Sequence, residues 1–321
     1  MATGQAFTAM PVAARRSILA DCNPMLAQLL NGLQYGLLLF LVASGLTLVF
    51  GVMGVINLAH GSLFMIGAYV AFLVAKTTGT LWLALPVGLV GGALAGALLQ
   101  WGLFRHFAKR EHLDQVMLTF ALILLAEELR WLVAGNDFHS VPVPAMLDFS
   151  VPVVAGFAYS AYRFAVIGVC LVLAGAMFWW VERTRMGAVI RAAAENPEMV
   201  DVLGLDARRV HLLVFAAGTA LAVIAGVLAA PLTSVYPGMG DGLLIISFVV
   251  VVIGGLGSIS GAFWAALLIG MVDTLGKAYG PGFQGLGAIG TVIAALAGSS
   301  VYLLMIGVLL WRPTGLFGHR A

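Results

Sequence analysis

The sequence predicts an all-α, polytopic integral membrane bundle of about eight to nine spans, two of them broken by glycines. Of the 321 residues, 62% are hydrophobic and 9% are charged, whereas a soluble domain carries about 25% charged residues. Charge-free stretches such as 22–75 and 278–311 exceed the roughly 20 apolar residues that a helical span needs. Because lipid offers no hydrogen-bond partners to an open backbone, such stretches must form helices or broken helices inside a bundle.

The expected spans are bounded to within a few residues. They lie near 26–51, 53–75, 81–104, 114–134, 163–181, 210–232, 242–254, 259–276 and 286–311. Residues 1–25 are expected to form an N-terminal leader, because they lack the apolar core of a cleavable signal peptide. Residues 26–318 form the expected membrane domain, and residues 319–321 form a short tail.

Lysines and arginines set the expected orientation in the membrane. They gather in residues 105–112, in residues 182–209 and in the C-terminal tail, whereas 135–162 and 233–241 have none. By the positive-inside rule, the basic loops and the tail face the cytoplasm. The prolines of 135–162 predict an ordered, non-helical external loop. The side of the N-terminus stays open: either the leader is translocated, or the stretch "GVMGVINLAHGS" enters the membrane and returns.

Residues 182–209, here called the coupling segment, hold ten of the thirty charged residues of the chain. Good helix formers over 187–195 predict a first short helix. Asn196 is a suitable N-cap for a second helix, with Pro197 at its first position and Gly204 at its end. Asp206 is then placed to cap the helix that follows.

The small residues Ala192, Ala193 and Ala194 allow close approach of another surface to the coupling segment, whereas a plain solvated loop would need neither small residues nor caps. A plain loop remains the alternative interpretation. The candidate docking residues are Arg191, Ala193, Ala194, Glu195, Asn196, Pro197, Glu198 and Gly204.

Two glycine-interrupted apolar segments lie in opposite halves of the chain. Transporters use such discontinuous pairs along the substrate path, where freed backbone groups line a cavity. Asn57 and His60 are three residues apart and share a helical face if the segment is helical there. The candidate path or gate residues are Asn57, His60, Gly61, Ser62, Gly254, Gly255, Gly257, Ser258 and Gly261. The alternative is that these residues only hold neighbouring helices together.

The remaining polar groups in apolar stretches have a partner close by in the sequence. Glu127 and Arg130 are spaced i,i+3, and Asp273 and Lys277 are spaced i,i+4, which predicts local ion pairs. An ion-coupled transporter would instead need an acidic residue without a partner at mid-membrane and no charged insert. The sequence therefore favours a transporter of another kind.

Four stretches carry a resemblance to one family. The coupling segment, with "TRMGAVIRAAAENPEMVDVLGLDARRV", resembles the EAA loop of ABC importer permeases, specifically the branched-chain amino acid (leucine/isoleucine/valine) permeases. "GLTLVFGVMGVINLAHGSLFMIGAYVAF" at 45–72 is similar to that family's first membrane segment. "VIGGLGSISGAFWAALLIG" at 252–270 and "RPTGLFG" at 312–318 resemble its glycine-serine hairpin and its C-terminal ending.

The resemblance implies a transmembrane permease subunit of a binding-protein-dependent importer. It implies that cytosolic ABC ATPase subunits dock on the coupling segment, that a second, related permease completes a heterodimer, and that a periplasmic solute-binding protein delivers the solute. One departure bears on the solute: residues 240–255, "GDGLLIISFVVVVIGG", have no basic residue where the family commonly carries a lysine before the hairpin. Urea, short amides or other small solutes therefore stay open beside leucine-type amino acids.

Several other functions lack their sequence signals. A nucleotide-binding P-loop needs GxxxxGK[ST], but Ala278 follows the pair Gly276-Lys277, so we expect no ATPase site and no cofactor in this chain. The six histidines have no HExxH spacing and the two cysteines no metal-ligand spacing, which disfavours a membrane-embedded enzyme or a metal site. A net charge of +2 does not suggest a nucleic-acid partner.

Overall fold

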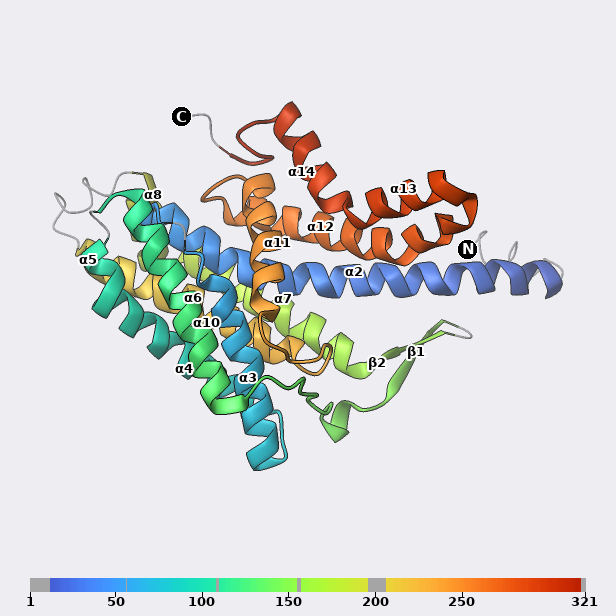
Figure 1. Cartoon of the computed structure of the whole chain (residues 1–321), viewed down its shortest axis with the longest axis horizontal. Coiled ribbons are helices and arrows are strands. Elements are labelled where there is room, and N and C mark those ends of the chain that lie inside the picture. The colour runs from blue at the N-terminus through green and yellow to red at the C-terminus, as the bar shows by residue number, and fades with distance from the viewer. Residues whose placement is uncertain (1–11, 56, 108–109, 155–156, 196–205, 319–321) are drawn as a thin grey trace.

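A computed structural model describes residues 12–55, 57–107, 110–154, 157–195 and 206–318 of the chain (Figure 1). The helices are α2 (Val12–Met53), α3 (His60–Thr78), α4 (Ala84–Leu99), α6 (His112–Ala134), α7 (Ala161–Arg183), α8 (Arg185–Glu195), α10 (Ala207–Ala229), α11 (Met239–Gly254), α12 (Ile259–Tyr279), α13 (Gly287–Gly298) and α14 (Ser300–Trp311). The shorter elements are the π-helix η1 (Gln100–Phe104), the single turn α5 (Arg105–Phe107), the 3-10 turns η2 (Ala145–Leu147) and η3 (Gly280–Leu286), and strands β1 (Ser150–Val154) and β2 (Phe157–Ser160).

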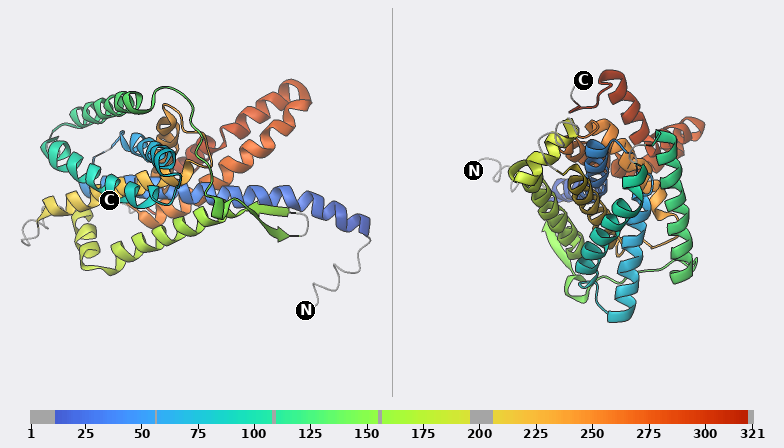
Figure 2. Two further views of the ribbon diagram at one scale, coloured as in Figure 1. Left: turned by 90° about the horizontal axis from the view of Figure 1, so that it is seen from below. Right: turned by 90° about the vertical axis from the view of Figure 1, so that its left-hand side faces the viewer.

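The helix α2 is the centre of the bundle. It runs along the long axis of the molecule, with α12 beside it (Figures 1 and 2). Residues 37–49 of α2 are buried, among α7, α10, α11 and α12. A helix that is apolar all round needs such burial on every side, which explains why this stretch, among the most apolar of the chain, lies innermost.

Glycines let α3 and α10 approach each other closely. A Cβ atom on Gly67 would lie 2.0 Å from the carbonyl oxygen of Val223. A Cβ atom on Gly226 would lie 2.0 Å from the carbonyl oxygen of Phe64. Only glycine fits at both positions, because the two backbones themselves are in contact, as in tightly packed membrane helices generally.

The predicted all-α membrane bundle is confirmed. Within the described residues, six helices are long and apolar enough to cross a membrane, or seven if the bent pair α13–α14 is one span. The charged α6 and the shorter, apolar α11 are the two further spans that the sequence predicted, so eight to nine spans remain compatible with the structure. A two-stranded hairpin is its only sheet among the residues described.

The predicted span 286–311 is not one continuous helix. α13 and α14 meet at a bend of 70° after Gly298. Ser299 leaves the helical conformation, and its N–H still bonds back to the carbonyl of Ala295, which closes α13. Glycine next to serine is a common place for a sharp helix kink.

The first candidate span, Pro24–Met53, agrees with the expected span 26–51, although the helix α2 itself reaches back to Val12. The second expected span, 53–75, begins its helix only at His60, which leaves Gly54 to Ala59 non-helical within the described residues. The predicted break in this segment is therefore confirmed.

The described part of the loop 135–162 is largely non-helical, as predicted. Its β1 and β2 pair antiparallel, with Ser150 opposite Ser160. His139 and Val235 exchange two backbone hydrogen bonds of 2.9 and 2.8 Å. The two loops without Lys or Arg therefore lie against each other, while α5 and α8 of the basic loops lie together at another end of the molecule (Figure 1). This arrangement agrees with the orientation inferred from the basic residues.

Candidate translocation path and coupling segment

Asn57 builds the turn from which α3 starts. Its side-chain oxygen Oδ1 accepts the N–H of Ala59 at 3.1 Å, and its backbone oxygen accepts the N–H of His60 at 3.2 Å. Asparagine favours such local turns because its short amide can take the place of a backbone acceptor. Asn57 is therefore fixed by its own loop and does not reach across to a neighbouring helix through Oδ1.

His60 is buried and connects α3 to α2. Its Nε2 atom lies 3.0 Å from the carbonyl oxygen of Val42, to which it donates, and only 1% of the residue is exposed. Its Nδ1 atom has no hydrogen-bond partner among the described residues. This contact supports the alternative in which His60 holds two helices together. Asn57 and His60, predicted as a pair on one face, have different partners.

A cavity of about 290 Å³ lies between the start of α3, the second half of α4 with η1, and α6. Among the residues that the structure describes, Asn57 and Ser62, two of the predicted path residues, are the only polar side chains at its wall. Leucines from α4 and α6 and Phe104 of η1 supply most of the remaining wall. His60 and Gly61 do not line it. No sequence pattern could single out the α4, η1 and α6 residues, because they are ordinary apolar residues in their own helices.

Gly61 brings the starts of α3 and α11 together. A Cβ atom on Gly61 would lie 2.4 Å from the carbonyl oxygen of Gly240, and one on Gly240 would lie 2.2 Å from the carbonyl oxygen of Gly61. The N-terminal ends of the two helices therefore meet at one point of the bundle. The role of Gly61 in the structure is close packing.

The second broken segment is a glycine turn between α11 and α12. Gly255 and Gly257 have positive φ values of 99° and 81°, a region that favours glycine. Ser258 caps α12, because its Oγ atom accepts the N–H of Gly261 at 3.1 Å. A Cβ atom on Gly51 would lie 3.1 Å from the Cα atom of Gly257. The two glycine-broken segments that the sequence singled out are thus in contact.

The C-terminal "RPTGLFG" segment holds this turn in place. Leu316 donates its N–H to the carbonyl of Ile253 at 2.8 Å, and Phe317 donates to the carbonyl of Gly254 at 3.1 Å. These bonds satisfy carbonyl groups at the end of α11 that have no partner within the helix. A Cβ atom on Gly255 would lie 2.5 Å from the backbone nitrogen of Gly318. Both the glycine turn and the "RPTGLFG" segment stood out in the sequence, but nothing in the sequence predicted that they contact each other.

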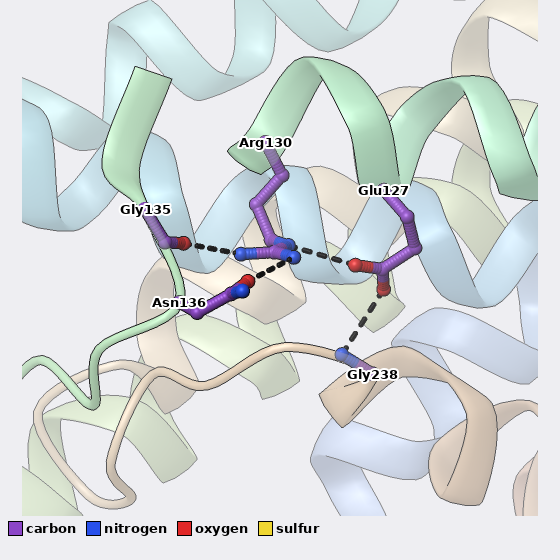
Figure 3. A network of polar contacts seen from close by, with 5 residues as sticks. All are labelled: Glu127, Arg130, Gly135, Asn136 and Gly238. Atoms are coloured by element: carbon purple, nitrogen blue, oxygen red, sulfur yellow. Dashed lines mark hydrogen bonds and ion pairs between the residues drawn. The ribbon is translucent and has the colours of Figure 1, made fainter. Parts of the chain in front are cut away.

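The predicted Glu127–Arg130 pair is present, with 2.7 Å between Oε2 and Nε, and it belongs to a larger network (Figure 3). Arg130 also donates to the carbonyl of Gly135 at 2.5 Å and to the side chain of Asn136 at 3.1 Å. Glu127 accepts the backbone N–H of Gly238 at 3.0 Å, just before α11 begins. The network therefore ties the end of α6 to the start of α11, and Glu127 has partners on both sides.

We expect the change Glu127→Ala to destabilise the protein by about 2 kcal/mol, because it removes a charged hydrogen-bond acceptor and leaves the largely buried Arg130 without its carboxylate. Thermal unfolding of the purified protein in detergent measures this loss. The exposed neighbour Glu128 provides the matched control, and Glu128→Ala is expected to change the stability little. Equal effects of the two changes would contradict a stabilising role for the network.

The second predicted pair is also present. Lys277 Nζ lies 2.7 Å from Oδ2 of Asp273, four residues earlier on α12. The lysine is exposed while the carboxylate is largely buried. Like Glu127, Asp273 has a basic partner, as expected.

In the coupling segment, α8 folds back sharply on α7. The Thr184 Oγ1 atom accepts the N–H of Gly187 at 3.0 Å and so caps the new helix. Arg191 donates from Nη1 to the carbonyl of Val181. A Cβ atom on Gly187 would lie 2.1 Å from that same carbonyl oxygen. The first predicted helix is confirmed, and a glycine, a cap and an arginine fix its angle.

The exposed and buried sides of α8 are clearly separated. Ile190 and Ala193 are 2% and 1% exposed and belong to the apolar core. Ala192 and Ala194 are exposed. Ala193 therefore packs inside this chain, although it was among the predicted docking residues. Asn196, Pro197, Glu198 and Gly204 lie outside the described residues.

Asp206 caps the helix α10, as predicted. Its carboxylate accepts the backbone N–H of Arg208 at 3.1 Å and pairs with Nε of Arg209 at 3.1 Å. A carboxylate at this position also interacts favourably with the positive N-terminal end of the helix. The coupling segment thus joins the bundle at two fixed points, Thr184 and Asp206.

Comparison with known proteins identifies the family. The model of the branched-chain amino acid transport system / permease component family matches residues 28–311. The chain is 29% identical to the high-affinity branched-chain amino acid transport system permease protein BraD of Pseudomonas aeruginosa, over 92% of this chain and 96% of that protein. It is 30% identical to the permease protein LivH of Escherichia coli K12, over the same shares. It is 26% identical to the permease protein LivM of the same strain, over 85% of this chain and 66% of that protein.

No solved structure gives a significant match. The family model covers most of the chain, and the helices that are long and apolar enough to cross a membrane lie almost entirely within the matched residues. This multi-pass membrane protein therefore belongs to the family of permease components of branched-chain amino acid transport systems.

Proposed function

We propose that this chain is the transmembrane subunit of a binding-protein-dependent ABC importer in the bacterial inner membrane. It carries branched-chain or related small amino acids into the cytoplasm, and separate ATPase subunits hydrolyse the ATP. The observation that supports this most directly is α8, a capped and rigidly angled helix with one buried and one exposed side. Family membership supports the class of solute, since BraD and LivH are both named for branched-chain amino acid transport.

The exposed side of α8 is suited to receive a partner, and its buried side is suited to pass on a movement. Ala192 and Ala194 let another surface come close, because neither has a side chain beyond Cβ. Ile190 and Ala193 pack in the same apolar cluster as Val49 of α2 and Val214 of α10. An ATPase that pushes on α8 therefore acts directly on two central helices.

A second permease of the same family completes the assembly in this proposal. The chain resembles both LivH and LivM, two permease proteins of a single Escherichia coli strain. Two such related chains in one bacterium favour a heterodimer. An extracytoplasmic binding protein is the remaining partner, and it meets the face where the loops around His139 and Val235 contact each other.

The proposal is tested by co-purification of ATPase subunits with this chain. The changes Glu195→Arg and Ala194→Trp are each expected to lower the recovered ATPase about tenfold or more, since disrupting a central residue of an interface costs about 2 kcal/mol or more. Glu111→Arg makes the same charge reversal in the other basic loop, on an exposed residue, and is expected to change nothing. Wild-type recovery from Glu195→Arg and Ala194→Trp, or no ATPase with the wild type, would contradict docking on the coupling segment.

Another small solute, such as urea or a short amide, is the alternative within the same family. It is favoured by one observation: α11 has no basic residue to meet a carboxylate. Competition separates the two, because excess urea should lower leucine uptake only if both solutes use the same path.

A further inference from the structure

We infer that the cavity between α3, α4 and α6 is the place inside the permease where the solute is held, and that it takes an amino acid with an aliphatic side chain. This inference rests on the proposed function. It assigns Asn57 and Ser62 to the polar end of the solute, and the leucines of α4 and α6 to its side chain.

The polar wall of the cavity has donors that the protein itself does not use. Oδ1 of Asn57 accepts the N–H of Ala59, which leaves the amide Nδ2 as the free group. Neither Nδ2 of Asn57 nor Oγ of Ser62 has a hydrogen-bond partner within the part of the chain that the structure describes. Asn57 is 1% and Ser62 is 5% exposed, so water outside the bundle hardly reaches them. Buried polar groups normally have partners, and a bound solute supplies them.

A carboxylate fits beside the polar lining residues Asn57 and Ser62 without a basic side chain. Asn57 and Ser62 lie at the start of α3, where the N-terminal end of the helix carries a partial positive charge. Discontinuous helices in transporters point such ends at the anionic group of a substrate. The missing lysine of α11 is therefore no obstacle to an amino-acid solute, because neutral donors and the helix end take its place.

The apolar part of the cavity wall fits an aliphatic side chain. Leu98 and Leu99 of α4 and Leu122, Leu125 and Leu129 of α6 belong to this part. The volume of about 290 Å³ lies near the lower limit of ordinary small-molecule sites, about 300–1,000 Å³. An apolar pocket distinguishes solutes by size, with about 10-fold or more for each methylene group.

A lipid chain is the other possible occupant, because Leu98 and Leu125 are 66% and 54% exposed at the rim. An acyl chain would leave the polar groups of Asn57 and Ser62 unpaired, which is unfavourable in a buried site. An amino acid satisfies both the polar and the apolar wall. Asn57 and Ser62 therefore favour an amino acid over a lipid chain as the occupant of the cavity.

The test is ATP-driven uptake by the complete transporter in proteoliposomes, with leucine and alanine as solutes. Leu125→Trp fills the cavity, and we expect it to lower leucine uptake about tenfold or more but alanine uptake much less. Leu124→Trp makes the same change on a neighbouring exposed residue that does not line the cavity, and should leave both rates unchanged. Equal losses for both solutes, or unchanged leucine uptake with Leu125→Trp, would contradict the site.

Thiol labelling provides a measurement that does not depend on transport. In the complete transporter with Cys22 replaced by serine, Ala95→Cys places a thiol at the cavity, and Val90→Cys places one elsewhere on α4. Leucine should slow the reaction of N-ethylmaleimide with the first thiol alone. Asn57→Asp keeps the acceptor for Ala59 but repels a carboxylate, and should abolish this protection. Protection that survives Asn57→Asp, or no protection by leucine, would overturn the assignment. A wild-type complex without any ATP-driven uptake would instead contradict the proposed function.

Discussion

The change Gly226→Val is expected to destabilise the folded protein by about 3 kcal/mol or more. This is a large fraction of the stability of a typical protein, so little correctly folded chain should remain in the membrane. A Cβ atom on Gly226 meets the backbone of α3, 2.0 Å from the carbonyl oxygen of Phe64 and 2.9 Å from the nitrogen of Ala68. A flexible side chain could rotate away from such a contact, but a backbone cannot. The helices must separate, and the contact between α3 and α10 is lost along its length.

The yield of monodisperse protein in detergent and its thermal midpoint measure this effect. Gly91→Val is the matched control, because Gly91 is also a helical glycine, but a Cβ atom there meets no other atom within 4 Å. We expect Gly91→Val to behave like the wild type. A normal yield and midpoint for Gly226→Val would show that α3 and α10 do not pack as described.

The change Gly255→Val is expected to lower ATP-driven uptake about tenfold or more while the protein still inserts into the membrane. Two costs combine at this position. Its φ of 99° disfavours any residue with a side chain, at about 1–3 kcal/mol. A Cβ atom there also lies 2.5 Å from the backbone nitrogen of Gly318, so the C-terminal segment must leave the turn.

Two further glycines show which of these costs matters. Gly257→Val has the strained φ of 81°, but its Cβ atom keeps an ordinary distance of 3.5 Å from Gly51, so a smaller loss of transport is expected. Gly242 lies earlier in α11, has no strained φ, and a Cβ atom there meets no other atom within 4 Å. The Gly242→Val protein should therefore transport normally. Unaltered uptake with Gly255→Val would show that the turn only connects α11 and α12.

Much of the fold could be predicted from the sequence because membrane helices are encoded locally. The charge-free stretches determine the spans, and the glycines and Asn57 mark the break before α3. Asp206 as a helix cap and the Glu127–Arg130 pair also follow from spacing alone. Each of these features depends on residues within one or two helical turns of each other.

Features built from distant parts of the chain could not be predicted. His60 binds the backbone carbonyl of Val42, and a pattern of side chains in the sequence cannot predict a backbone partner. The cavity combines three helices whose apolar residues look alike in sequence. The contact of the C-terminal segment with Gly254 joins two motifs some sixty residues apart by backbone hydrogen bonds, which any residue type except proline can donate.

The candidate site also combines features that the local sequence indicates with features that depend on distant parts of the chain. Asn57 and Ser62, which the sequence proposed as path residues because polar residues in apolar segments are rare, line the cavity. The sequence grouped them with His60 and Gly61, which instead connect α3 to α2 and α11. Ala193 was chosen for its size, but small residues serve packing inside a chain as well as docking between chains.

The most direct test of the account is leucine uptake by proteoliposomes that contain this chain with its partner permease, ATPase subunits and binding protein. We predict that uptake requires ATP on the side of the membrane that carries the ATPase subunits. We also predict that uptake persists when ionophores abolish all ion gradients. Uptake that proceeds without ATP and disappears with the ion gradients would contradict the importer and identify an ion-coupled transporter.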